Sequence, residues 1–193
     1  MATDHSQGWE VVADRFIEIR SEIGAELVRS WAQECLVPSS PIVDVGCGSG
    51  VPIAKALSDE GFVVFGIDAS CSLVKAFRGN LPGVSVACEP AQESAFFGRT
   101  FKGAVSIGLI FLLGADDQNT VLGKVASALE PGGRFLFSAP QQACEWHDTL
   151  TGRTSLSLGA DAYASRLNRS GLVLVRCLTD DAGNNYYDAV KRQ

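Results

Sequence analysis

Three glycines on alternate positions stand between an apolar segment and a segment that favours a helix. Residues 42–45 form a β-branched run interrupted only by Asp44, and Gly46, Gly48 and Gly50 follow it. Glycine lacks a Cβ, so it adopts positive φ values and lets a ligand approach the backbone closely. A helix that starts after the loop adds unpaired N–H groups and a partial positive charge. The spacing predicts a strand, a ligand-binding loop and a helix.

The glycine pattern differs from three other well-known ligand or catalytic loops. Val51 stands where a dinucleotide-binding fingerprint needs a further glycine. The Gly-Lys-Ser/Thr ending of a P-loop is missing from this segment. Ser49 lies directly between two glycines, so it is not the centre of a Gly-x-Ser-x-Gly nucleophile elbow. The pattern therefore disfavours these three kinds of site.

A carboxylate follows the second predicted strand. Residues 62–67 form a continuous apolar run, which is typical of a strand buried on both faces of a parallel sheet, and Asp68 follows the run. A carboxylate at this end of a second parallel strand, about twenty residues after a glycine loop, hydrogen-bonds a ribose in α/β folds. The alternative role is a helix N-cap, but Ser70 already suits it. We therefore expect Asp68 to bind a ribose.

Residues 43–50, Val-Asp-Val-Gly-Cys-Gly-Ser-Gly, resemble the first motif of the class I S-adenosylmethionine-dependent methyltransferases. That motif has the form hydrophobic-Asp-hydrophobic-Gly-x-Gly-x-Gly, and in this family an acidic residue at the place of Asp68 holds both ribose hydroxyls. The Leu-Glu-Pro-Gly-Gly segment at 129–133 resembles the family's turn before its fifth strand. The resemblance covers roughly residues 40 to 190. It implies the fold and the cofactor, S-adenosyl-L-methionine with S-adenosyl-L-homocysteine as its product.

The resemblance also implies a set of residues that contact the cofactor. Pro90 stands where the family often has an aspartate, so the contact to the adenine amino group stays open between the side chains of Gln92 and Glu93 and the backbone of Ala91. The expected cofactor-binding residues are Asp44, Gly46, Cys47, Gly48, Gly50, Asp68, Ala69, Ala91, Gln92, Glu93 and Ile107.

The order of predicted elements indicates one α/β domain over residues 1–193. Amphipathic helices fill residues 1–39, with a break near residues 20–24, and form an N-terminal helical cap. Residues 40–193 alternate between strands and helices and end in an antiparallel hairpin. This order predicts a three-layer, doubly wound Rossmann-like methyltransferase fold. The resemblance implies a seven-stranded, mostly parallel sheet of order 3-2-1-4-5-7-6 with helices on both faces. Asp116 or Asp117 is expected to cap the helix before the Pro131 turn.

The segment 139–158 follows the carboxyl end of a parallel strand and has an irregular pattern, which predicts a functional loop. In it, His147 is the candidate general base, because the ordinary pKa of a histidine side chain is near neutrality.

The family often covers its pocket with the segment before the first motif. One of Tyr186 and Tyr187 is expected in the core and the other at a pocket, since neighbouring strand residues face opposite sides. The expected acceptor-binding residues are Trp9, Phe16, Arg20, Leu109, Trp146, Asp148 and Tyr187.

The composition of the chain disfavours several classes of binding partner. Its formal net charge of −6 lacks the clustered positive charge that nucleic acid binding demands. No apolar run approaches the ~20 residues of a membrane span, and the polar start is not a signal peptide. We therefore expect a cytoplasmic monomer or homodimer with no nucleic acid or membrane partner. The six cysteines contain no Cys-x-x-Cys pair and only two histidines accompany them, which predicts reduced thiols and no metal site.

These observations together favour a methyltransferase that acts on a small molecule. Methyl transfer from a sulfonium needs only in-line alignment of an N, O or S nucleophile and exclusion of water. The first alternative is a non-catalytic protein that binds S-adenosylmethionine or a protein partner on the same fold. The second is an NAD-dependent oxidoreductase, which Val51 in the glycine loop disfavours.

Overall fold

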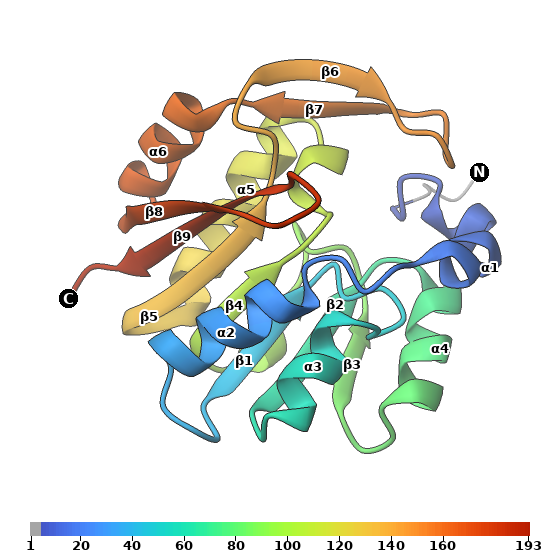
Figure 1. Cartoon of the computed structure of the whole chain (residues 1–193), viewed down its shortest axis with the longest axis horizontal. Coiled ribbons are helices and arrows are strands. Elements are labelled where there is room, and N and C mark those ends of the chain that lie inside the picture. The colour runs from blue at the N-terminus through green and yellow to red at the C-terminus, as the bar shows by residue number, and fades with distance from the viewer. Residues whose placement is uncertain (1–4) are drawn as a thin grey trace.

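Seven strands form one sheet in the computed structural model, which describes residues 5–193 (Figure 1). The sheet order is β3-β2-β1-β4-β5-β9-β8. The first five are parallel, while β9 runs antiparallel to both β5 and β8. β6 and β7 lie outside this sheet, so β8 and β9 are its sixth and seventh strands along the chain. With this numbering the observed order is the predicted order, 3-2-1-4-5-7-6. The strands are β1 (Pro41–Val45), β2 (Val63–Asp68), β3 (Ser85–Cys88), β4 (Phe101–Ser106), β5 (Leu129–Ser138), β8 (Leu172–Thr179) and β9 (Asn185–Lys191).

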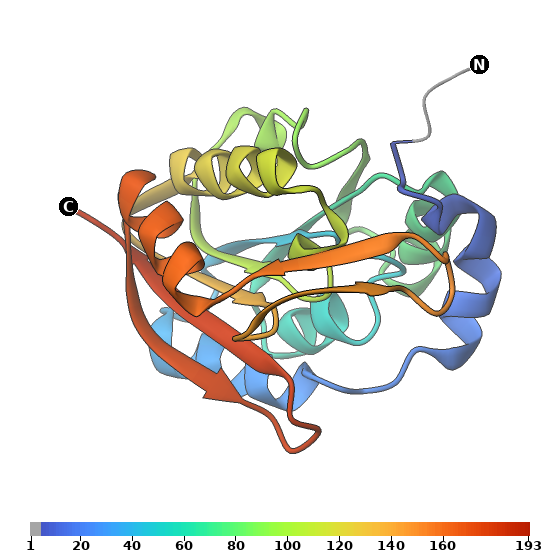
Figure 2. The ribbon, with the colours of Figure 1, turned by 90° about the horizontal axis from the view of Figure 1, so that it is seen from above.

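Helices cover both faces of the sheet, as predicted. Three α-helices pack on one face and two on the other, and Figures 1 and 2 show α3 and α5 on opposite sides. The first group is α2 (Ala25–Cys35), α3 (Ile53–Asp59) and α4 (Cys71–Asn80), and the second is α5 (Ala115–Ala128) and α6 (Ala160–Arg169). The described residues also contain the helix α1 (Trp9–Ile19) and two 3₁₀ turns, η1 (Phe96–Gly98) and η2 (Ile110–Leu112).

The predicted break in the N-terminal helices is confirmed. α1 ends at Ile19, and α2 begins after Gly24, which has a φ of 85°. Glycine tolerates this left-handed conformation without the clash of a Cβ. α2 packs against α3, whereas α1 contacts α4. The division of the chain into a cap over 1–39 and a core over 40–193 stays a prediction.

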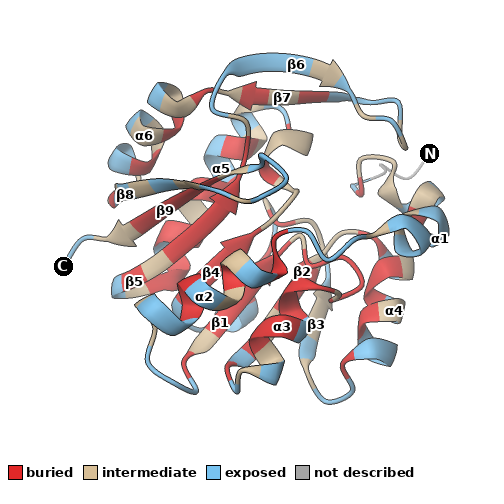
Figure 3. Ribbon diagram, viewed as in Figure 1, coloured by how far each residue is buried: buried red, intermediate tan, exposed pale blue. Residues whose placement is uncertain are grey.

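The core has two layers because strand side chains alternate between the two sheet faces. Phe135 and Phe137 lie in the cluster under α5 and α6, whereas Leu136 lies in the cluster under α2 and α3. The same alternation separates Tyr187 from Tyr186 in β9. The buried strands stand out in Figure 3, where most exposed residues lie on outer helix faces and loops.

A buried carboxylate ties the antiparallel edge of the sheet to α2. Asp188 in β9 is fully buried and accepts a hydrogen bond of 2.9 Å from the indole N–H of Trp31. Arg134 of β5 and Arg176 of β8 both form ion pairs with the same carboxylate. A buried charge is tolerated only when it is paired and hydrogen-bonded. These contacts hold β5, β8, β9 and α2 together.

Two local predictions are wrong. Residues 139–158 do not form an irregular loop, because β6 (Ala143–His147) pairs antiparallel with β7 (Thr154–Leu158) in a separate two-stranded ribbon. Neither candidate aspartate caps α5: the helix begins at Ala115 with Gly114 as its N-cap, and Asp116 and Asp117 lie in the first turn. There the carboxylates still interact favourably with the helix dipole.

The prediction that every cysteine is reduced is also wrong. Cys71 and Cys88 form a disulfide with a Cα–Cα distance of 5.6 Å, while Cys35, Cys47, Cys144 and Cys177 are free. The crossover from β2 through α4 brings the start of α4 beside the end of β3. Sequence spacing does not reveal that proximity. Within residues 5–193, no helix combines the length and apolarity that crossing a bilayer requires.

Candidate cofactor and acceptor site

A cavity of about 560 Å³ lies at the carboxyl ends of the central parallel strands. The loops after β1, β2, β3, β4 and β5 line it, together with side chains of α1 and of the β6–β7 ribbon. Figures 1 and 2 show α1 and this ribbon beyond the same edge of the sheet. Ligands of open α/β sheets bind at this edge. The predicted site residues that line it are Trp9, Phe16, Arg20, Gly46, Gly48, Asp68, Ala69, Ala91, Gln92, Ile107, Leu109, Trp146 and Asp148.

The glycine loop is held against β2 and needs its glycines for two different reasons. The N–H groups of Gly46 and Cys47 donate to the carbonyl of Ile67, at 2.8 and 3.1 Å. Gly46 has a φ of 79°, and a Cβ there would lie 2.6 Å from the Cβ of Leu109. Gly50 faces the other way, because a Cβ there would collide with the ring of Phe77 in α4. Gly50 shapes the loop but does not line the cavity.

Asp68 is anchored by two backbone groups. One carboxylate oxygen accepts a hydrogen bond of 2.8 Å from Gly48 N, and the other accepts one of 2.8 Å from Ser70 N. Burial raises the pKa of Asp68, and these two hydrogen bonds oppose the rise. Ser70 caps α4 by accepting a hydrogen bond from Leu73 N, as expected. The carboxylate of Asp68 therefore reaches the cavity in a fixed orientation.

Asp44 is a buried carboxylate beneath the glycine loop. Its side chain is 2% exposed, and its Oδ2 has no hydrogen-bond partner among the described residues. Burial, followed by repulsion from Asp68, raises the pKa of Asp44 to about 7, and attraction to Arg20 opposes this rise. A small pocket of about 30 Å³ lies at this point, with Arg20, Phe16 and Ile107 in its wall. An unpaired buried acceptor of this kind fits a cationic donor.

Arg20 sits opposite Asp44 and lines both the small pocket and the main cavity. Burial lowers the pKa of Arg20, and the charge of Asp44 raises it. The guanidinium carbon lies 6.0 Å from the ring centre of Phe16, at the limit of a cation–π contact. The two opposite charges therefore both line the small pocket, which shares Arg20, Gly46 and Gly48 with the cavity. This arrangement can bind a ligand that carries both an ammonium and a carboxylate.

The segment after β3 lies at the other end of the predicted cofactor site. Pro90, Ala91 and Gln92 line the cavity there. Glu93 does not line it, and its Oε1 lies 3.3 Å from His5 Nδ1 at the surface. Of the two side chains left open for the adenine amino group, the structure brings Gln92 to the cavity.

The cover of the cavity consists of two aromatic pairs. In α1, the rings of Trp9 and Phe16 meet edge to face with centres 5.1 Å apart. On the ribbon side, Trp146 packs against Phe111 with ring centres 5.4 Å apart. Gln7, just before α1, accepts a hydrogen bond of 3.1 Å from Arg153 in the ribbon turn. The N-terminal segment and the ribbon therefore meet over the cavity.

Besides Gly50 and Glu93, two more predicted site residues line neither pocket. His147 is exposed at the end of β6, between Trp146 and Asp148, which both line the cavity. Strand alternation turns a residue between two inward neighbours outward. Tyr187 is fully buried in the core, where its ring stacks on Phe137 with centres 4.8 Å apart. These corrections remove the structural support for His147 as a base and for Tyr187 as an acceptor contact.

Tyr186 lines the cavity in place of Tyr187. Its hydroxyl donates a hydrogen bond of 2.7 Å to Asp180 in the β8–β9 turn. Other lining residues escaped the sequence reasoning, because the segments that carry them follow α1, β4, β5 and β8 and have no motif. They include Ile23, Phe111, Leu112, Leu113, Pro140, Gly183, Asn184 and Asn185. The only available signal was their position after the carboxyl ends of strands or in the final hairpin turn.

Comparison with known proteins agrees with this geometry. A family model described as a methyltransferase domain matches residues 42–133, from β1 to the turn inside β5. Over this segment, which is just under half of its length, the chain resembles the class I S-adenosylmethionine-dependent methyltransferases. A methyltransferase relative, the O-methyltransferase resE of Aspergillus sclerotiorum, is 31% identical over 132 residues, which are 65% of this chain and 46% of that protein. The chain spans about half the length of the first curated relatives it matches.

Solved methyltransferases share the fold of this chain. The CcbJ methyltransferase from Streptomyces caelestis superposes with a TM-score of 0.78 at 17% identity, covering 99% of this chain and 100% of that one. The 1,6-didemethyltoxoflavin-N1-methyltransferase of Burkholderia thailandensis gives 0.75 at 18% identity, covering 100% and 92%. That structure contains 1,6-didemethyltoxoflavin and S-adenosylhomocysteine. At these identities the likeness establishes the fold.

Proposed function

We propose that this protein is a methyltransferase that binds S-adenosyl-L-methionine in the cavity and transfers its methyl group to an N, O or S atom of a small molecule. The observation that carries the proposal is the unpartnered carboxylate oxygen of Asp44, buried beneath a glycine loop whose next charged neighbours are Asp68 and Arg20. A fold with no ligand at this place gains nothing from a buried and unpaired carboxylate.

The residues around the cavity match the parts of the cofactor. Asp44 offers an acceptor for the ammonium of the methionine moiety, and Arg20 offers a partner for its carboxylate. Asp68 holds an oriented carboxylate for the ribose hydroxyls, since each oxygen of a carboxylate accepts more than one hydrogen bond. Ala91 and Gln92 border the place for the adenine ring. Gly46 and Gly48 let the ligand approach the loop backbone.

When bound, S-adenosylmethionine supplies an electrophilic methyl carbon on a sulfonium. The chain itself has to hold the acceptor in line with that carbon and keep water away, and orientation of this kind contributes ~7 to 11 kcal/mol. Leu109 and Phe111 after β4 and Trp146 from the ribbon supply apolar walls for this purpose. Their closure over the cavity excludes water from the reacting atoms.

The acceptor side of the cavity favours a compact molecule with an apolar or aromatic body. Trp146 and Phe111 form one wall, and Tyr186 and Asn185 form another. Asp148 Oδ1 accepts hydrogen bonds from Leu150 N and Thr151 N, while its Oδ2 makes none among the described residues. Asp148 therefore has one carboxylate oxygen to offer a polar group of the acceptor.

The test is a calorimetric titration of the purified protein with S-adenosylmethionine, S-adenosylhomocysteine and NAD. Binding of the first two and not of NAD is expected. Asp68→Ala should weaken S-adenosylhomocysteine binding by about 1.5 to 3 kcal/mol, the range of hydrogen bonds to a charged group. Asp59→Asn, at an exposed carboxylate on α3, is the matched control and should leave affinity unchanged.

Activity is then tested with a panel of small amines, phenols and thiols and a radiolabelled methyl donor. Methylation of one chemical class identifies the acceptor atom. Tight cofactor binding without methylation of any acceptor would favour the alternative of a non-catalytic binding protein. Absence of binding to all three titrants would refute the proposed function.

A further inference from the structure

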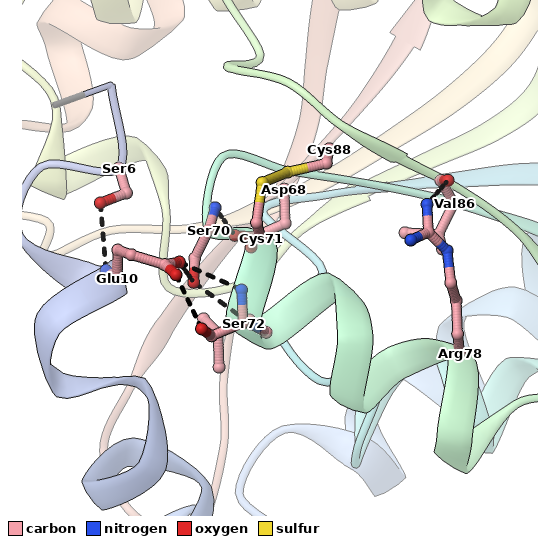
Figure 4. The surroundings of a disulfide bond; sticks show 10 residues. Ser6, Glu10, Asp68, Ser70, Cys71, Ser72, Arg78, Val86 and Cys88 are labelled. Atoms are coloured by element: carbon pink, nitrogen blue, oxygen red, sulfur yellow. Dashed lines mark hydrogen bonds between the residues drawn. A yellow bond between two sulfur atoms is a disulfide. The ribbon is translucent and has the colours of Figure 1, made fainter. Parts of the chain in front are cut away.

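The disulfide between Cys71 and Cys88 lies next to the proposed ribose carboxylate. Cys71 is the first residue of α4, three positions after Asp68, and Cys88 is the last residue of β3, directly opposite Asp68 in the sheet register. Both cysteines are exposed at the surface. Figure 4 shows the bond beside Asp68 and Ser70. The bond therefore closes a covalent loop over residues 71–88, and this loop begins three residues after Asp68.

The two segments joined by this bond both line the cavity. Asp68 and Ala69 precede Cys71, while Pro90, Ala91 and Gln92 follow Cys88. β3 is a four-residue edge strand, and β2 is its only neighbour among the strands of residues 5–193. Short strands at a sheet edge, with one hydrogen-bonded neighbour, are drawn from the less stable parts of a fold. The disulfide is thus an added restraint on a weakly held segment of the site.

The same bond also bears on the cover of the cavity. Ser70 and Ser72 flank Cys71, and both hydroxyls donate to the carboxylate of Glu10 in α1, at 2.6 and 2.7 Å (Figure 4). Ser72 N donates to Glu10 as well, at 3.1 Å. Glu10 is therefore the anchor of α1 on the start of α4. Cys71 lies between the two serines, so freeing Cys71 from Cys88 also weakens the hydrogen bonds of Ser70 and Ser72 to Glu10.

We propose that Cys71 and Cys88 form a reversible thiol–disulfide control of the adenosyl site: reduction loosens the segments 68–72 and 89–92 and weakens ligand binding. This inference rests on the proposed function. The reductant is a dithiol, whose thiolate attacks one sulfur and releases the other as a thiolate that takes up a proton. The second thiol of the reductant then resolves the mixed disulfide. Two cysteine thiols and one oxidised reductant result, so electrons and protons balance.

The physical reason is preorganisation. A ligand that binds loosened segments must order them, and this ordering reduces the affinity. In the oxidised protein the disulfide already holds Cys71, three residues after Asp68, against Cys88, which directly precedes the segment 89–92. We therefore expect reduction to weaken binding of S-adenosylhomocysteine by about threefold to tenfold, the effect of ordering about one side chain.

The experiment titrates the full chain with S-adenosylhomocysteine by calorimetry, once oxidised and once after treatment with dithiothreitol. Alkylation and mass spectrometry verify the two states, because the oxidised protein has four free thiols and the reduced protein has six. The variant Cys71→Ser/Cys88→Ser should bind like the reduced protein and should not respond to reductant. Cys177→Ser, at an exposed free thiol on β8, is the matched control and should respond like the wild type.

Hydrogen exchange of the ligand-free protein gives an independent readout. Faster exchange in residues 68–72 and 89–92 after reduction supports the proposal, and unchanged exchange there overturns it. Equal affinity of the oxidised and reduced proteins also overturns it, as does a disulfide that dithiothreitol does not reduce in the native protein. If S-adenosylhomocysteine bound neither state, the proposed function would fail, whereas the exchange result would still decide whether the disulfide holds the two segments.

Discussion

Replacing Asp44 with asparagine should separate the stability of this protein from its ligand binding. Asp44 is nearly fully buried, and its Oδ2 has no partner among the described residues. Burial is the first cause that raises its pKa, from 3.8 to about 7, and the charge of Asp68 adds to it. Asparagine has almost the same shape but never ionises. Asp44→Asn therefore removes the charge and keeps the packing.

The magnitude follows from the linkage between proton binding and folding. In the unfolded chain Asp44 ionises at its ordinary pKa, whereas in the native protein it keeps its proton to about pH 7. Between these values the native state binds the additional proton, so stability falls as pH rises, by about 1.4 kcal/mol for each pH unit. Between pH 5 and pH 8 the wild type therefore loses about 2 to 3 kcal/mol through this group. The loss stops above the native pKa.

The assay is urea unfolding of wild type and Asp44→Asn at pH 5, 7, 8 and 9. The free energy of unfolding of the variant, relative to wild type, should rise by about 2 to 3 kcal/mol between pH 5 and 8 and then stay level. The cost of burying the amide is the same at every pH, so it does not affect how the stability difference between the two proteins changes with pH. A difference between the two proteins that does not change with pH would refute the reasoning.

The same substitution should weaken ligand binding. An amide lacks the negative charge that attracts an ammonium, so Asp44→Asn should bind S-adenosylhomocysteine at least about tenfold more weakly at pH 8, in line with a hydrogen bond between charged groups. A variant that is more stable than wild type and binds the ligand equally well would remove Asp44 from the proposed site.

Three further substitutions test other parts of the structure. Gly46→Ala should destabilise the protein by about 2 kcal/mol or more, because of its positive φ and the 2.6 Å contact with Leu109, and urea unfolding measures this. Glu10→Gln should speed hydrogen exchange in α1 with little change in the melting temperature. Because hydrogen bonds from Ser70 and Ser72 lower the pKa of Glu10, acidification of the wild type should release α1 in the same way as pH falls through that lowered pKa. His147→Ala should leave turnover nearly unchanged with any acceptor that the screen identifies, whereas a loss of about 100-fold, typical of a general base, would restore His147 to the mechanism.

The cofactor half of the site was predictable because it is local. Gly46, Gly48 and Asp44 belong to one strand, loop and helix, and Asp68 ends the neighbouring strand. Such a unit folds in one way because the glycines, the buried strand and the helix start each restrict the backbone. The parallel sheet then brings the ends of its strands to one edge, which places Asp68 beside Gly48. Residue types at fixed spacing determined this much.

The acceptor half depended on pairings that no local pattern encodes. A shift of one position turns a strand residue to the opposite face, and the choice between Tyr186 and Tyr187 depended on how β9 lies between β5 and β8. The same alternation along the β6–β7 ribbon brought Trp146 inward and left His147 exposed. Cys71 and Cys88 meet only because β3 pairs with β2 after α4 crosses over. Sequence alone determined which chemistry the chain carries, whereas tertiary packing decided which side chains face the cavity, because each strand offers both of its faces until its neighbours bury one.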